Sequence, residues 1–129
     1  MKHLRSAASV AFALVLLTQS AHSKEKKWKG YLIDRMCMKA VANSSDPLDF
    51  VYHHTKDCVL MPACKKKGFT LYLVKNKKWL RLSKKGNELA EKVISQSKRN
   101  SAFYVSVEGK LVKGILNVDA IKEIQNKKH

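Results

Sequence analysis

The chain has 129 residues, and its 26 lysines and arginines outnumber its 10 aspartates and glutamates to give a formal net charge of +16. This length allows one small domain and excludes a large multidomain protein. A balance this basic attracts polyanions such as nucleic acid, acidic glycans or anionic lipid headgroups, unless the lysines serve only to keep the protein soluble.

The N-terminal residues have the layout of a secretory signal peptide. Lys2 and a second basic residue precede an apolar run at 10–17, and small residues at 21 and 23 come before a cut at Lys24. The run is shorter than the ~20 residues that span a bilayer, which argues against a membrane anchor. We therefore predict a signal peptide at 1–23, a single domain at 24–129 without a transmembrane segment, and export to the periplasm or out of the cell.

The first elements of the domain are a strand and a helix. Apolar and polar residues alternate from Trp28 to Arg35, and this alternation predicts a strand. Asp46 followed by Pro47 is a typical helix start, because aspartate caps the first turn and proline fits the first helical position. We predict one helix from Pro47 to about Met61, ended by the proline that follows.

The rest of the chain alternates with the period of strands, except for one amphipathic segment. A glycine at 109 between two charged residues indicates a turn at 108–110. The predicted elements, in chain order, are strands at 69–74 and 79–82, a helix at about 87–98, a strand at 102–107 whose turn leads into 111–113, and a last strand through 115–118 and 121–124.

This element order predicts an α+β, mostly β fold. The order matches an OB-fold-like five-stranded barrel with one helix between strands 3 and 4, and it adds a helical insert that carries cysteines and histidines between strands 1 and 2. Another small α+β sandwich with the same element order is the alternative. Seven residues are expected in the barrel core: Leu71, Leu73, Leu80, Tyr104, Val105, Ile115 and Val118.

All three cysteines, Cys37, Cys58 and Cys64, lie in or next to the insert. In an oxidising compartment two of them are expected to form a disulfide that ties the insert to the barrel, and the sequence does not say which two. A redox-active or other reactive thiol is a further reading of the same residues. Cys-x-x-Cys, the common redox motif, is absent from the chain.

The alternative is a metal site formed by Cys37, His54, Cys58 and Cys64. His54 and Cys58 are four residues apart, so one helix would place both on the same face. Three thiolates and an imidazole suit zinc, whereas thiolates near methionines suit copper(I); the nearby methionines are Met36, Met38 and Met61. His53 would point away on that helix, and we expect it to be solvated or to cap the helix.

The segments Gly30–Cys37, His54–Cys58 and Met61–Cys64, with Gly68 after them, resemble a family of small exported bacterial proteins. Members of that family share Asp-x-x-Cys, His-x-x-x-Cys and a further cysteine ahead of an OB-like β-domain. The resemblance covers nearly all of residues 28–124. It implies export and the OB-like fold, and it implies no established activity.

Nothing in the sequence has the spacing of a catalytic triad, so we predict a non-enzymatic binding domain with no catalytic residue and no cofactor other than the alternative zinc or copper ion. Asp34 is expected to cap the turn before Cys37 with its side-chain oxygen. Four aromatic residues could stack on bases or sugars, or else belong to the barrel core: Trp28, Tyr72, Trp79 and Phe103.

Overall fold

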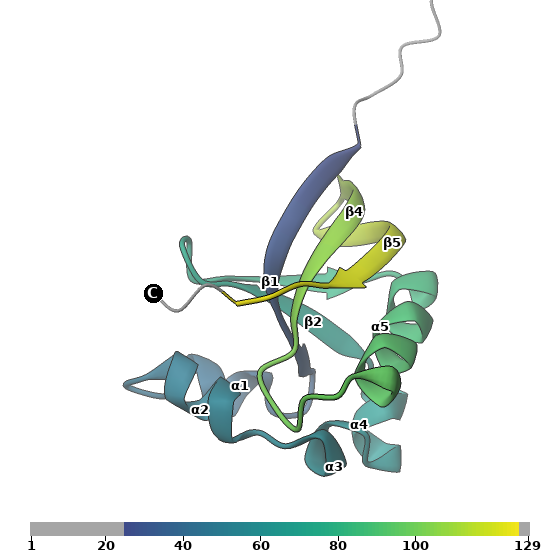
Figure 1. The fold of residues 1–129 in the computed structure, drawn as a ribbon. Coiled ribbons are helices and arrows are strands. Elements are labelled where there is room, and N and C mark those ends of the chain that lie inside the picture. The colour runs from purple at the N-terminus through teal and green to yellow at the C-terminus, as the bar shows by residue number, and fades with distance from the viewer. Residues whose placement is uncertain (1–24, 127–129) are drawn as a thin grey trace, which may run out of the picture.

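The computed structural model describes residues 25–126, so the predicted signal peptide lies outside the described residues. Five strands form one curled sheet (Figure 1), and its order is β1-β2-β3-β5-β4, with β4 paired back to β1. All neighbours are antiparallel except β3 and β5. The α+β class and the five-stranded sheet are confirmed. The strands are β1 (Lys26–Asp34), β2 (Phe69–Leu73), β3 (Lys78–Leu82), β4 (Tyr104–Val112) and β5 (Ile115–Glu123).

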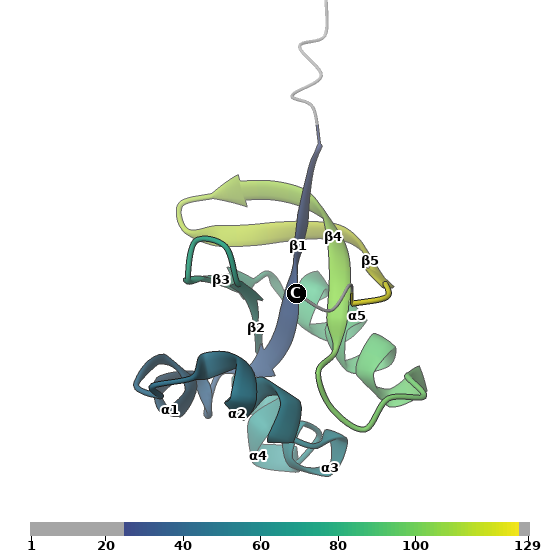
Figure 2. The same cartoon turned by 60° about the vertical axis from the view of Figure 1, so that its left-hand side comes forward.

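Four short helices form the insert between β1 and β2, and a longer helix, α5 (Lys84–Gln96), follows β3. Two views show the insert helices gathered at the end of β1 where the strand finishes (Figures 1 and 2). The cysteines and histidines of the insert are therefore carried beside one end of the sheet. The insert helices are α1 (Met38–Ala42), α2 (Pro47–His53), α3 (Lys56–Val59) and α4 (Pro62–Lys67).

The predicted single helix from Pro47 to Met61 is wrong, because the chain leaves helical geometry at His54. The Asp46 side chain caps α2 by accepting from the amide of Asp49, as the sequence indicated. His54 then has extended backbone angles, and the amide of Lys56 donates to the Asn100 carbonyl at 2.6 Å instead of continuing the helix. A contact to a distant loop thus outweighs local helix propensity at this point.

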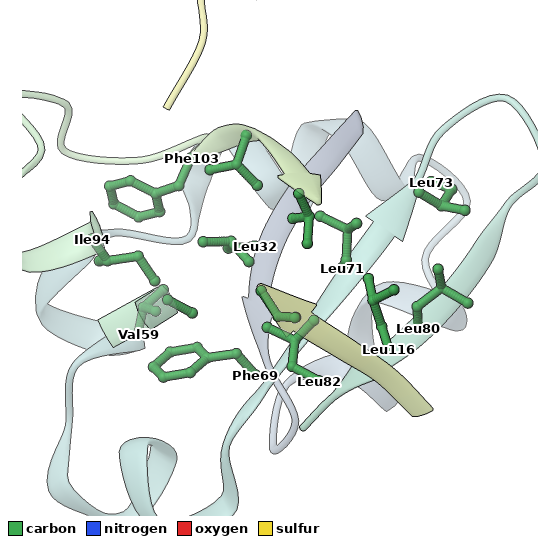
Figure 3. Packing of buried hydrophobic residues seen from close by; sticks show 14 residues of the cluster. Leu32, Val59, Phe69, Leu71, Leu73, Leu80, Leu82, Ile94, Phe103 and Leu116 are labelled. Atoms are coloured by element: carbon green, nitrogen blue, oxygen red, sulfur yellow. The ribbon is translucent and has the colours of Figure 1, made fainter. Parts of the chain in front are cut away.

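Side chains on the two faces of β1 enter two different clusters. Leu32 points inside the curled sheet, whereas Tyr31 and Ile33 face the insert on the outside. Figure 3 shows Val59 of α3 and Ile94 of α5 beside Leu32 in the inner cluster. One insert helix therefore contributes a fully buried side chain to the core of the sheet, and the insert packs as part of the fold.

Of the seven residues expected in the core, five are buried, namely Leu71, Leu73, Leu80, Val105 and Val118. Tyr104 packs against the outer cluster instead, and Ile115 is 42% exposed, so its predicted burial is wrong. Both lie near strand ends, where alternation alone does not say how far the core extends.

The turn predicted at 108–110 is also wrong, because β4 continues through it. The register between β4 and β5 shifts at Glu108 and Gly109, and the hairpin turn falls at Lys113 and Gly114, which both have positive φ. A Cβ at Gly109 would lie 2.2 Å from the Asn117 carbonyl oxygen. Glycine is needed here for the close approach of the neighbouring strand.

Helix α5 begins three residues earlier than predicted, since Ser83 caps it. The Ser83 hydroxyl accepts from the amide of Gly86 and also from the amide of Val118 in β5.

Among residues 25–126, no helix has the length and apolar character needed to cross a membrane.

Candidate functional site: a buried Asp–His pair among thiols

Asp34, the last residue of β1, is fully buried at the centre of the site. Its Oδ1 accepts from the amide of Cys37 at 3.0 Å, which confirms the predicted cap of this turn. Its Oδ2 lies 2.5 Å from Nε2 of His54, a residue 20 positions further along the chain. Asp34 therefore joins the end of β1 to the insert, a contact that the sequence did not indicate.

His54 reaches Asp34 because it lies in the break between α2 and α3. It is buried, and its ring packs on Phe50 with the ring centroids 5.4 Å apart. The prediction that one helix presents His54 and Cys58 on a common face is wrong for the same reason. His53 is exposed as expected, and its Nδ1 lies 3.2 Å from a carboxylate oxygen of Asp49.

The three cysteines differ in burial. Cys37 is half-buried, Cys64 is buried, and Cys58 is exposed, with its sulfur 3.4 Å from the Thr55 hydroxyl. All three lie within the described residues, and none of them is joined in a disulfide there. The fold therefore places two thiols inside the site and one at its outer edge.

Three donor groups come close enough to share one ion. A carboxylate oxygen of Asp34, the sulfur of Cys37 and a ring nitrogen of His54 all lie within 4.8 Å of one another. Cys64 adjoins this group, because the charge of the Asp34 carboxylate helps to raise the pKa of its thiol. The sulfur of Cys64 also lies 3.9 Å from the sulfur of Met36. Of the four predicted metal ligands, Cys37 and His54 meet in this group and Cys64 adjoins it. Cys58 is exposed, yet its charge is among the causes that raise the pKa of both Cys37 and Cys64.

The electrostatics of the site follow from burial and from one carboxylate. Burial by itself raises the pKa of Asp34, but the hydrogen bonds from His54 and from the Cys37 amide outweigh it, so the net pKa is lowered. Burial, and then the charge of Asp34, raise the pKa of Cys37 to about 11. The same two causes raise the pKa of Cys64.

A raised pKa disfavours the thiolate at Cys37 and Cys64, whereas a nucleophilic cysteine needs its thiolate favoured. A cation placed between them would favour the thiolates, because its charge compensates both the burial and the neighbouring carboxylate. The arrangement is therefore suited to holding a soft or borderline metal ion and poorly suited to nucleophilic attack.

Sequence reasoning gave Asp34 only a local role and missed its bond to His54. The available signal was an acidic side chain at the end of an apolar strand, three residues before a cysteine. An aspartate buried there needs a donor or a cation.

Comparison with family models, with curated proteins and with solved structures gave no match for this chain. Function must therefore be argued from the site itself.

Proposed function

We propose that this protein is a non-enzymatic metal-binding domain whose site is formed by Cys37, His54 and Cys64, with Asp34 beside them. The observation that carries the proposal is the meeting of the Asp34, Cys37 and His54 donor atoms within 4.8 Å, in a place where the aspartate and the histidine are both buried. Thiolate and imidazole ligands are those of zinc and of copper.

Asp34 supports this function in a way that is common around metal ions. Because Nε2 of His54 is bonded to Asp34, Nδ1 would be the nitrogen that holds the ion. A carboxylate that hydrogen-bonds the other nitrogen of a ligating histidine fixes the orientation of its ring and makes it a better ligand. The negative charge of Asp34 also lowers the cost of bringing a cation to a buried place. The proposal gives Asp34 the role of orienting His54 in addition to capping its own turn.

Metal titration of the reduced protein tests the proposal, with two adjacent histidines as a matched pair. Zinc affinity, measured by competition with a chromophoric chelator, should fall strongly in Cys37→Ser and His54→Ala. It should stay unchanged in His53→Ala, because His53 is exposed and, among residues 25–126, its ring bonds to Asp49 alone. Equal affinities in the two histidine variants, or no zinc binding by the unaltered protein, would contradict the proposal.

The predicted disulfide is the competing account of the same cysteines. Unfolding the protein without reductant and counting thiols separates the two accounts, since one disulfide leaves one thiol, whereas a metal site leaves three after chelation. Under the disulfide account, reduction lowers the melting temperature and His54→Ala has no effect on metal content.

The fold and the compartment belong to the same proposal. We assign the sheet to the OB class, and the assignment is supported by the strand order β1-β2-β3-β5-β4, by the return of β4 to β1, and by a helix between β3 and β4. Export stays a prediction from the N-terminal sequence. An intact mass that corresponds to a chain beginning at Lys24 would support it.

A second candidate function, binding of a polyanion, is favoured by a basic hollow on the outside of the sheet. The hollow has a volume of about 600 Å³ and lies over β1, β4 and β5. Lys29 lies opposite Ser106, which lies opposite Lys122, so two lysines flank one serine across three strands. Neither lysine has an acidic partner among the described residues, whereas Lys27 is paired with Glu108 at 3.2 Å.

The four aromatic residues that could stack on bases or sugars do not line this hollow. Tyr72 and Trp79 stack on each other with ring centroids 4.4 Å apart, and Phe103 is buried in the inner cluster. Trp28 is half-buried under Lys26, whose Nζ lies 4.7 Å from the ring centroid. These four aromatic residues are used in packing, which leaves charge as the main means of attracting a ligand.

Salt-dependent retention on heparin tests this second function. Replacing Lys29 and Lys122 by glutamate should lower the eluting salt concentration more than the same replacement at Lys75 and Lys77, which lie in the loop between β2 and β3. Both double variants change the net charge equally, so an equal shift would mean that binding follows net charge alone.

A further inference from the structure

We infer that the ion taken by this site is copper(I), and that the thioether of Met36 is one of its ligands, next to the thiol of Cys64. The inference rests on the proposed metal function and goes beyond it by naming the ion and a ligand outside the Cys/His set. The observation that carries it is the contact between the Met36 and Cys64 sulfurs at 3.9 Å.

The exposure of Met36 is not that of a core residue. Methionine ordinarily fills gaps in hydrophobic cores. Met36 is 51% exposed, although its sulfur reaches the buried Cys64. Packing alone does not account for a long apolar side chain that is half in water and has its sulfur at the thiol site.

The position of Met36 is fixed from both sides of its turn. On one side, the Asp34 carboxylate accepts from the amide of Cys37. On the other, the amide of Arg35 donates to the Gly68 carbonyl at 2.9 Å, and the Arg35 side chain reaches the Lys67 carbonyl. The turn is therefore tied to the end of α4, the helix that carries Cys64, and the sulfur contact is a consequence of the fold.

The separation of the two sulfurs matches that of two ligands on one ion. With metal–sulfur bonds of about 2.3 Å, two sulfurs lie roughly 3.8 Å apart at a tetrahedral angle and roughly 4.0 Å apart at a trigonal one. The observed 3.9 Å falls between these values. The Cys64 thiol donates a hydrogen bond to the Met36 sulfur, and on binding the ion would take the place of the thiol proton, which is released to solvent.

The presence of a thioether distinguishes between metals. Zinc is bound in proteins by thiolate, imidazole and carboxylate groups, whereas copper(I) is selected by soft thiolate and thioether ligands. A site that holds Cys37, Cys64 and His54 alone serves either metal. Adding Met36 increases the affinity for copper(I) and leaves that for zinc unchanged.

The experiment measures copper(I) and zinc affinities separately for Met36→Leu and for a matched variant, Met61→Leu. Met61 is 52% exposed and lies directly before α4, so the two methionines match in exposure and neighbourhood. Copper(I) affinity is measured anaerobically against bicinchoninate, and zinc affinity against a chromophoric chelator. We expect Met36→Leu to lower copper(I) affinity about tenfold or more, by analogy with the loss of a supporting group. Zinc affinity should not change, and Met61→Leu should affect neither metal.

A direct readout accompanies the affinities. The ¹³C-labelled methyl resonance of Met36 should shift much further with copper(I) than with zinc, because zinc at Cys64 removes only the hydrogen bond from that thiol to Met36. The urea unfolding curves of both leucine variants verify that they fold. Copper(I) affinity that is equal in the two variants, or a Met36 methyl that shifts no further with copper(I) than with zinc, would overturn the inference and leave the proposed function intact. Failure of the unaltered protein to bind either metal would overturn both.

Discussion

Asp34 and Asp49 each face a histidine, and the two pairs differ mainly in their burial. Asp34 and His54 have side chains that are 0% and 7% exposed, whereas those of Asp49 and His53 are 66% and 76% exposed. Solvent screens the exposed pair, so the pair contributes little to the free energy of unfolding. If one partner of the buried pair is removed, no water is at hand to take its place, so the loss is larger. Comparing the two aspartates therefore shows how burial changes the contribution of an aspartate–histidine pair to stability.

We expect Asp34→Asn to destabilise the protein at pH 7 by roughly 1.5–3 kcal/mol, because it removes hydrogen bonds to a buried charged group. Asp49→Asn should change the free energy of unfolding by less than about 0.5 kcal/mol. Urea unfolding of both variants measures the difference. Equal effects would mean that the buried pair contributes no more than a surface contact.

The same carboxylate predicts a dependence of stability on pH. The pKa of Asp34 is lower in the folded protein than its ordinary value, so the folded state binds its proton less tightly than the unfolded state does. Its contribution to stability is fully present above the unfolded pKa of about 3.9 and is lost as the pH falls through the lower folded value. Urea unfolding between pH 6 and pH 3 should therefore show a smaller acid loss in Asp34→Asn than in the unaltered protein.

Local sequence patterns predicted the turn at Asp34 but not its partner. The cap of the Cys37 amide depends on residues three apart, which a local motif contains. The bond to His54 depends on where the insert bends, and that bend is set by Asn100 in a distant loop. The candidate ligands were identified by residue type, whereas the group that organises them could be found only from the fold.

At the scale of elements, the strands were predictable and their ends were not. Alternation located all five strands, because one face of each packs inside the sheet. Gly109 was assigned to a turn, since glycine between charged residues is typical of turns, yet the Asn117 carbonyl approaches it across β4 and β5. The helix start at Ser83 was missed although its cap on the Gly86 amide is local, because glycine in the first turn disfavours a helix.

The two glycines of the β4–β5 hairpin should respond differently to alanine. A methyl group at Gly109 would clash with the backbone of Asn117, so we expect a loss of about 3 kcal/mol or more. At Gly114 nothing lies within 4 Å of an added Cβ, and only its positive φ, at about 1–2 kcal/mol, opposes the change. Chemical denaturation gives both values, and a larger loss at Gly114 would contradict the bulge at Gly109.

For the whole molecule, metal binding should appear as thermal stability. A ligand that binds only the folded state at a hundred times its dissociation constant stabilises it by about 2.7 kcal/mol. For a domain of this size that corresponds to roughly 10–20 °C in melting temperature. Thermal scans under reducing conditions should show this rise with zinc or copper(I), and excess chelator should abolish it.

His54→Ala should show little or none of this rise, although it folds. A full rise in that variant would place the metal elsewhere in the molecule. The metal-free melting temperature of the same variant gives the separate structural effect of losing the bond to Asp34.

The insert consists of four helices of four to seven residues, each too short to be stable by itself. Segments of this kind open locally while the rest of a protein stays folded. Met36, Cys37 and Cys64 lie at the two ends of the insert, which are tied together beside β1, whereas His54 lies in its middle, between α2 and α3. Opening of the middle of the insert would therefore remove His54 from a bound ion while the sulfur ligands stay in place, so the opening rate of the insert would limit how long the ion keeps its full set of ligands.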